Sequence, residues 1–102
     1  MPKVSIIVLN YNGKHFLNDC INSVLKQDFS DYELMIVDNN SSDGSVDFVK
    51  QNFPNVVLIQ SDKNLGFAGG NNLGVKFSKG ELIVLLNNDT IAEEGWLKGL
   101  VD

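Results

Sequence analysis

The chain alternates between apolar runs and polar clusters, and four of the apolar runs stand out. They are rich in β-branched residues and occupy Val4–Leu9, Leu34–Val37, Val56–Ile59 and Leu82–Leu86. Near-continuous apolar runs of this kind are typical of strands buried on both faces of a parallel sheet. We therefore predict four strands, each covered on both faces.

Apolar residues at helical spacing lie between and after these runs. Their recurrence every three or four positions predicts an amphipathic helix over about His15–Gln27. A shorter helix is predicted over Val46–Phe53, where a proline follows and ends it. The same spacing predicts a last short helix that includes Trp96 and Val101.

A glycine-rich segment, Gly66–Gly80, precedes the fourth predicted strand, and its first nine residues hold four glycines. Such a density indicates close backbone approach or positive φ angles. Several of the other residues are too apolar for a simple linker, so the segment is either a helix or a packed loop. It is not a dinucleotide-binding fingerprint, which belongs in the turn after the first strand.

Strands that alternate with helices indicate an α/β fold with a mainly parallel sheet and helices on both faces. Right-handed crossovers place strands 3, 2 and 1 side by side, and if the fourth strand lies on the other side of the first, the order is 3-2-1-4. The strand order then reverses between the first and fourth strands, and open α/β sheets bind ligands at that point, beyond the carboxyl ends of the strands. We expect a Rossmann-like open sheet in one domain, with its site at this edge.

Polar residues follow three of the predicted strands directly, at Asn10–Asn12, Asp38–Gly44 and Asn87–Asp89. A carboxylate at the position of Asp38 can accept a hydrogen bond from a ring N–H of a base or from a ribose hydroxyl. We predict a ligand role for Asp38, and leave one open for Asn39. The second half of the same cluster is explained by helix capping, through residues that favour N-caps: Ser42, Asp43 or Ser45.

The Asn87–Asp89 triplet has two interpretations. Asp89 or Thr90 could cap a helix over Ile91–Trp96. Alternatively Asp89 could bind a metal, because magnesium and manganese sites use as few as one or two protein carboxylates when substrate phosphates complete the shell. Lys63 lies where it could approach a phosphate, or it is an ordinary exposed lysine.

Composition and charge exclude some classes of function. The net charge of −5 and the lack of a lysine or arginine cluster argue against a nucleic-acid partner. Cys20 is the only cysteine, so an intrachain disulfide and a thiolate zinc cluster are both excluded. No apolar run reaches the roughly 20 residues of a membrane span, and there is no signal-peptide pattern. These features predict a cytoplasmic protein.

In combination, four stretches resemble the inverting glycosyltransferases of family 2, which have the GT-A fold: VSIIVLNYN, ELMIVDNNSSDGS, NLGFAGGNNLG and LIVLLNNDT. The resemblance covers nearly all of the 102 residues. It implies that Asp38 recognises the nucleotide base and that the first-strand loop lies against the nucleoside, through Asn10, Tyr11 and Asn12. Asp89 matches the metal ligand at the diphosphate, which implies Mg²⁺ or Mn²⁺.

The resemblance has further implications for the donor. Two asparagines stand where the family's metal motif has acids, so we assign Asn87 and Asn88 to ribose or phosphate contacts. Asn39, Lys63 and Gly66 complete the expected donor site. The glycine-rich segment is most similar to the branch that includes rhamnosyltransferases, which implies a donor linked to dTDP or UDP.

In the family, the catalytic base and the acceptor-binding surface lie beyond the metal motif. No residue here matches the base. We therefore expect residues 1–102 to be the nucleotide-sugar-binding part of a GT-A domain, with the acceptor-binding half absent and no activity alone. We also expect a homo-oligomer formed through the edge of the fourth strand or the Trp96 region, and membrane association only in a full-length protein.

Two other functions stay open. A nucleotidyltransferase would need a glycine-rich phosphate loop after the first strand, where this chain has Asn10–Gly13. A non-catalytic α/β binding module of the response-regulator kind would need several carboxylates there, whereas Asn10 and Asn12 are uncharged.

Overall fold

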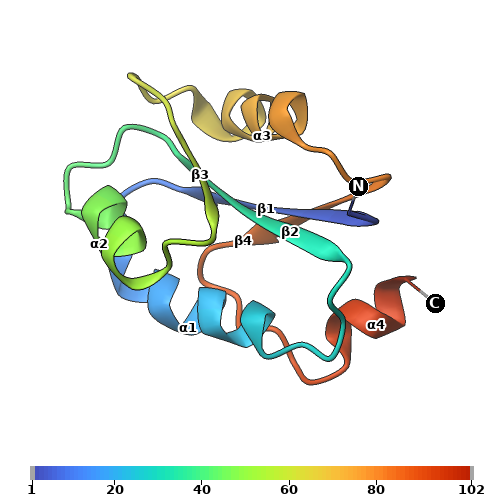
Figure 1. Ribbon diagram of the computed structural model, residues 1–102. Helices are drawn as coiled ribbons and strands as arrows, with labels where there is room; N and C mark the ends of the chain where they lie inside the picture. Colours follow the sequence, from blue (N-terminus) through green and yellow to red (C-terminus); the bar gives the residue numbers. More distant parts are fainter. Residues whose placement is uncertain (1, 102) are drawn as a thin grey trace.

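The computed structural model describes residues 2–101 as a parallel sheet covered by helices on both faces (Figure 1). The strands are β1 (Val4–Asn10), β2 (Tyr32–Asp38), β3 (Val57–Gln60) and β4 (Leu82–Asn87). The helices are α1 (Lys14–Leu25), α2 (Ser45–Asn52), α3 (Gly66–Phe77) and α4 (Trp96–Val101). The strand order is β3-β2-β1-β4 with every pair parallel, which confirms the predicted fold and strand order.

The two faces of the sheet carry different helices (Figure 1). Alternate residues of β1 point to opposite faces, as a pleated strand requires. Val4, Ile6 and Val8 pack in one core cluster with buried residues of α1, α2 and α4. Ile7 belongs to a second cluster, against which Leu73 of α3 packs. Both faces of β1 are therefore buried, which explains its unbroken apolar run.

The glycine-rich segment is the helix α3, and its glycines allow it to approach the sheet. A Cβ atom added at Gly74 would lie 2.8 Å from Cγ2 of Ile7 and 3.0 Å from Cγ2 of Val37. Gly66, where the helix begins, has a φ of +76°. Close approach and positive φ, the two reasons expected for this glycine density, therefore both occur.

The prediction that every strand is buried on both faces is wrong for the two outer strands. β4 lies at one edge of the sheet, and its Leu82, Ile83 and Leu85 are 43%, 40% and 51% exposed. β3 forms the other edge, one residue later than predicted. An apolar run predicts a strand, but it does not show whether another strand or helix packs beside that strand and buries it.

The predicted helix caps are only partly correct. The N-cap position of α2 is Gly44, with a φ of 86°, but Asp43, one of the three polar residues proposed for that role, accepts a hydrogen bond of 3.0 Å from the backbone N–H of Ser45 at the start of the helix. The turn at Asn88 and Asp89 does not cap a helix, because the following residues are irregular and α4 begins only at Trp96. Among residues 2–101, no helix combines the length and the apolar character that crossing a membrane requires.

Candidate functional site

The parallel register brings the ends of β1 and β2 together. Asn10 is the partner of Asp38 in the β1–β2 pairing, and each is the last residue of its strand. Nδ2 of Asn10 donates a hydrogen bond of 2.9 Å to Oδ1 of Asp38. Both residues are buried, at 0% and 2% exposed, so their polar groups depend on protein partners when no ligand is bound.

Asn10 also joins the loop after β4. Its Oδ1 accepts a hydrogen bond of 2.9 Å from Nδ2 of Asn88. Gly13 makes room for this contact, because a Cβ atom there would lie 2.7 Å from Oδ1 of Asn10 and would collide with the Asn88 amide. An amide is the side chain that can donate in one direction and accept in the other without adding charge. Asn10 therefore links the ends of β2 and β4.

The Asp38 carboxylate is held by Ser41, three residues after the end of β2. Its Oδ1 accepts from the Ser41 hydroxyl at 2.8 Å as well as from Asn10. Its Oδ2 accepts from the backbone N–H of Ser41 at 2.8 Å. A carboxylate offers about four lone-pair sites. Three are used here, and the one that remains is on Oδ2.

Ser41 connects this carboxylate to the first loop. Its hydroxyl oxygen accepts a hydrogen bond of 2.8 Å from the backbone N–H of Asn12, and Oδ1 of Asn12 accepts one of 2.8 Å from the backbone N–H of Ser42. We call this group the strand-end cluster: Asn10, Asn12, Asp38, Ser41 and Asn88. Sequence reasoning missed Ser41. The signal was present, since a hydroxyl residue shortly after an Asp is typical of a side-chain-stabilised turn.

Asn39 binds the start of α3. Its Nδ2 donates to the backbone oxygen of Gly66 at 3.0 Å, and its Oδ1 accepts from the backbone N–H of Leu65 at 3.3 Å. The structure thus brings two predicted donor-site residues together, Asn39 and Gly66. With Asn39 only 2% exposed, its amide serves to position the loop between β3 and α3.

The residues predicted to meet the diphosphate are spread along the sheet edge. Asn87 and Asp89 are exposed at the end of β4, while Lys63 is exposed in the loop after β3. β3 and β4 are three strand spacings apart, or about 14 Å. The structure therefore does not bring Lys63 next to Asp89. Tyr11, 52% exposed, lies between them in the loop after β1.

Asp89 is the predicted metal ligand, and its surroundings fit a cation whose other ligands come from substrate. Within residues 2–101, no group of three or more His, Cys, Asp or Glu side chains could hold a metal ion. Asp89 offers an exposed carboxylate, the hard oxygen donor that Mg²⁺ and Mn²⁺ prefer. The pKa of the Cys20 thiol is raised to about 11, mainly by burial and secondly by the negative charge of Asp89.

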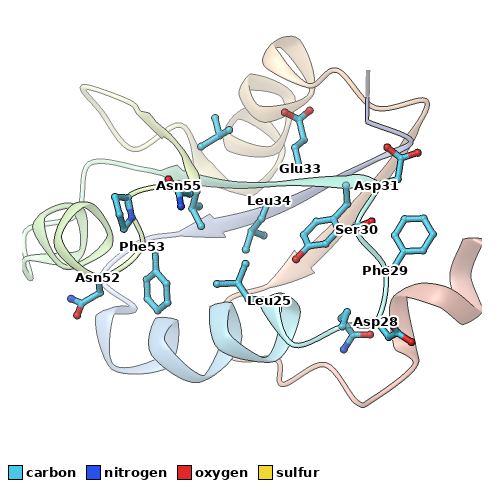
Figure 2. A pocket seen from close by; sticks show the side chains of 15 residues that line it. Leu25, Asp28, Phe29, Ser30, Asp31, Glu33, Leu34, Asn52, Phe53 and Asn55 are labelled. Atoms are coloured by element: carbon cyan, nitrogen blue, oxygen red, sulfur yellow. The ribbon is translucent and has the colours of Figure 1, made fainter.

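A groove of about 960 Å³ lies at the other end of the sheet (Figure 2). It is formed around the start of β2, the end of α1 and the turn after α2, and it shares no residue with the strand-end cluster. Its lining includes apolar side chains such as Leu25, Phe29, Leu34 and Phe53. The groove contains none of the predicted donor-site residues, so it does not bear on that site.

Residues 5–102 match the family model described as glycosyl transferase family 2. The chain belongs to this family.

Curated relatives agree with this assignment. Glycosyltransferase AglE of Haloferax volcanii is 30% identical, over 96% of this chain and 34% of its own length. A second relative is 34% identical over 86% of this chain and 35% of its own length. It is UDP-Glc:alpha-D-GlcNAc-diphosphoundecaprenol beta-1,3-glucosyltransferase WfgD of Escherichia coli. The chain therefore spans about a third of the length of these relatives.

Solved structures show the same fold. TarS 1–349 of S. aureus, crystallised in complex with UDP, matches with a TM-score of 0.88 and 29% identity over 97% of this chain and 31% of that chain. The mannosyltransferase PcManGT from Pyrobaculum calidifontis, in complex with GDP-Man and Mn²⁺, matches with a TM-score of 0.90 over 98% of this chain and 31% of that chain. At 24% identity, the second match bears on the fold alone. The fold is that of GT-A glycosyltransferases.

Proposed function

We propose that this chain is the donor-binding part of an inverting family 2 glycosyltransferase. It binds a nucleotide-diphosphate sugar whose sugar is transferred to an acceptor glycan or lipid. The strand-end cluster is the observation that carries this proposal. It gathers the ends of β1, β2 and β4 into one hydrogen-bonded unit at the carboxyl edge of the sheet, where open α/β sheets bind ligands.

The nucleoside is proposed to bind over Asp38, with Tyr11 and Asn12 beside it. The free lone pair on Oδ2 of Asp38 can only accept, so it suits a base with a ring N–H. Uracil and thymine both have one, and a donor linked to UDP or dTDP meets this requirement. The crystallised complex of TarS with UDP and the UDP-Glc named for WfgD support the uridine form.

The diphosphate is proposed to lie toward the end of β4, near Asn87, Asn88 and Asp89. Asp89 would hold a Mg²⁺ or Mn²⁺ ion together with diphosphate oxygens and water. When bound, the metal stabilises the negative charge of the departing nucleoside diphosphate. Asn88 donates one amide N–H to Asn10, so its amide oxygen and its second N–H are left to meet the donor. Asn39, Gly66 and Lys63 are proposed to border the donor from the β3 side.

Asp38 is the one carboxylate of the strand-end cluster, and its three hydrogen bonds together with its proposed contact to the nucleotide base leave it no lone pair to activate an acceptor hydroxyl. We therefore propose that residues 1–102 bind the donor without transferring its sugar, and that the catalytic base and acceptor site are supplied from elsewhere. A transfer assay with a labelled nucleotide sugar and a panel of acceptors tests this. Sugar transfer by the purified 102-residue chain would overturn it.

The donor proposal is tested by calorimetric titration of UDP, dTDP and GDP, with and without MnCl₂. We expect UDP and dTDP to bind and manganese to tighten the binding. The Asp38→Ala variant should bind more weakly in both conditions, whereas Asp89→Ala should lose only the part that depends on manganese. Asp62→Ala, which changes an exposed acid in the β3–α3 loop, is a charge-matched control.

Failure of every nucleotide to bind would remove this proposal. A nucleotidyltransferase would instead bind a nucleoside triphosphate with metal, and Asp38→Ala would have little effect on that binding. A non-catalytic binding module would bind none of these nucleotides. The cytoplasmic location and the association through the β4 edge or the Trp96 region, both expected from the sequence, stay predictions.

A further inference from the structure

The Ser41 hydroxyl lies between the two loops that are proposed to hold the nucleoside. It donates to Oδ1 of Asp38 at 2.8 Å and accepts from the backbone N–H of Asn12 at 2.8 Å. Nδ2 of Asn10 lies 3.3 Å from the same oxygen and donates to it as well. One hydroxyl thus joins the end of β2 to the loop after β1, across 29 positions of sequence.

These contacts decide which oxygen of Asp38 faces a ligand. With Asn10 and the Ser41 hydroxyl both on Oδ1, that atom has no lone pair left, and the carboxylate cannot rotate without breaking both bonds. Oδ2 holds only the Ser41 backbone N–H and keeps a free lone pair. Hydrogen bonds to a charged group are stronger than neutral ones, so this orientation is held firmly.

The same hydroxyl also fixes the backbone of the first loop. Asn12 has a φ of 51°, in the left-handed region that few residues other than glycine adopt and in which asparagine is enriched. Its backbone N–H is held by Ser41 and its side-chain oxygen by the backbone N–H of Ser42. Tyr11, the neighbouring residue, is 52% exposed, and the backbone on both sides of it is held through Asn10 and Asn12.

We propose that Ser41 is a positioning residue for the nucleoside: it sets base affinity by orienting the Asp38 carboxylate and by holding the Tyr11–Asn12 loop. This rests on the proposed donor-binding function. A hydroxyl that served folding alone would leave affinity for the base and for the diphosphate equally intact in any variant that folds. A positioning hydroxyl acts on the base side only, because the diphosphate is proposed to lie near β4.

The test compares the binding of two ligands to the purified 102-residue chain, UDP with MnCl₂ and inorganic pyrophosphate with MnCl₂. Ser41→Ala should weaken UDP binding about tenfold, the loss expected for a hydrogen bond to a charged group, and should leave pyrophosphate binding within about twofold. Ser41→Thr keeps the hydroxyl and should restore most of the UDP affinity. Ser42→Ala is the matched control, since the Ser42 side chain is exposed and its backbone N–H contact with Asn12 is unaffected.

The outcomes separate this inference from the function on which it rests. If the unaltered chain binds UDP, but Ser41→Ala and Ser42→Ala bind it equally well, the inference is overturned and the donor site stands. Equal losses of UDP and pyrophosphate in a folded Ser41→Ala chain would also overturn it. If the unaltered chain binds no nucleotide, both proposals fall. If Ser41→Ala does not fold, the same two ligands are titrated into Ser41→Cys, whose thiol is of similar size but is a weak donor. Ser41→Cys should then bind UDP more weakly and pyrophosphate as before.

Discussion

The side chains of Asn10 and Asp38, the last residues of two adjacent parallel strands, share a hydrogen bond of 2.9 Å in the interior of the molecule. Asn10 is 0% exposed, and its side chain holds both Asp38 and Asn88. Its amide donates a hydrogen bond to Asp38 and accepts one from Asn88. These two bonds fix the distance between the part of the site proposed for the base and the part proposed for the diphosphate.

Replacing Asn10 should therefore destabilise the fold. Asn10→Ala leaves Asn88 without its acceptor and removes a donor from Asp38, and we expect a loss of about 1–3 kcal/mol. Asn10→Asp keeps the acceptor but sets a second carboxylate against Asp38, so it should cost more than the alanine variant at pH 7. Urea unfolding measures both. Asn18→Ala, on the exposed face of α1, is the control. If Asn10→Asp unfolds at the same urea concentration as the unaltered chain, the hydrogen bonds of Asn10 do not stabilise the fold.

The close packing of α3 on the sheet gives a second prediction. A Cβ at Gly74 would crowd Ile7 and Val37, so Gly74→Ala should destabilise by about 1–3 kcal/mol, as overpacking does. Gly99 lies in α4, where an added Cβ meets nothing within 4 Å. Gly99→Ala should therefore be neutral or should stabilise by up to about 1 kcal/mol. Thermal unfolding of the two variants side by side checks this, and equal midpoints would refute it.

The buried thiol of Cys20 predicts a pH dependence. Burial and then the Asp89 charge raise its pKa from 9.0 to about 11, so the native state keeps the thiol proton above the pH at which the unfolded chain loses it. The stability that this contributes is fully present below pH 9.0 and is lost as the pH rises to about 11. Urea unfolding at pH 8 and pH 10.5 measures the loss.

Cys20→Ala is the control for this prediction, because lysines and tyrosines also titrate at high pH. The stability of the unaltered chain should fall more steeply between these two pH values than that of the alanine variant. Parallel pH profiles for the two proteins would show that the thiol does not contribute.

The exposed edge strand gives a prediction about association. Leu85 on β4 is 51% exposed and Leu100 on α4 is 53% exposed, so the two regions expected to associate can be tested separately. If copies of the chain pair through the β4 edge, light scattering should show a dimer that Leu85→Lys converts to a monomer, since an edge lysine blocks strand pairing. Leu100→Lys should then have no effect. The reverse result would assign the contact to the Trp96 region, and a monomer at high concentration would exclude both.

The apolar pattern by itself predicted the four strands, the helices after the first, second and fourth of them, and the parallel sheet, and it led to the observed strand order once the fourth strand was placed beside the first. It could do so because parallel strands covered by crossover helices allow few arrangements of a βαβαβ chain. The polar residues after β1, β2 and β4 likewise indicated the edge at which the site lies, since all parallel strands end there. The resemblance of four stretches to family 2 glycosyltransferases added the family, and the comparisons confirmed it.

Only the tertiary structure decided which of those residues are buried and what they hold. Exposure depends on neighbours, so the apolar run of β4 was wrongly expected to be covered on both faces, and the burial of Asn10 between Asp38 and Asn88 could not be read from the chain. The local sequence suggested only a turn between Asp38 and Ser41, and it could not show that the same hydroxyl accepts from the backbone N–H of Asn12, 29 residues away. Local composition specifies the ends of the strands, whereas their register decides which side chains meet there.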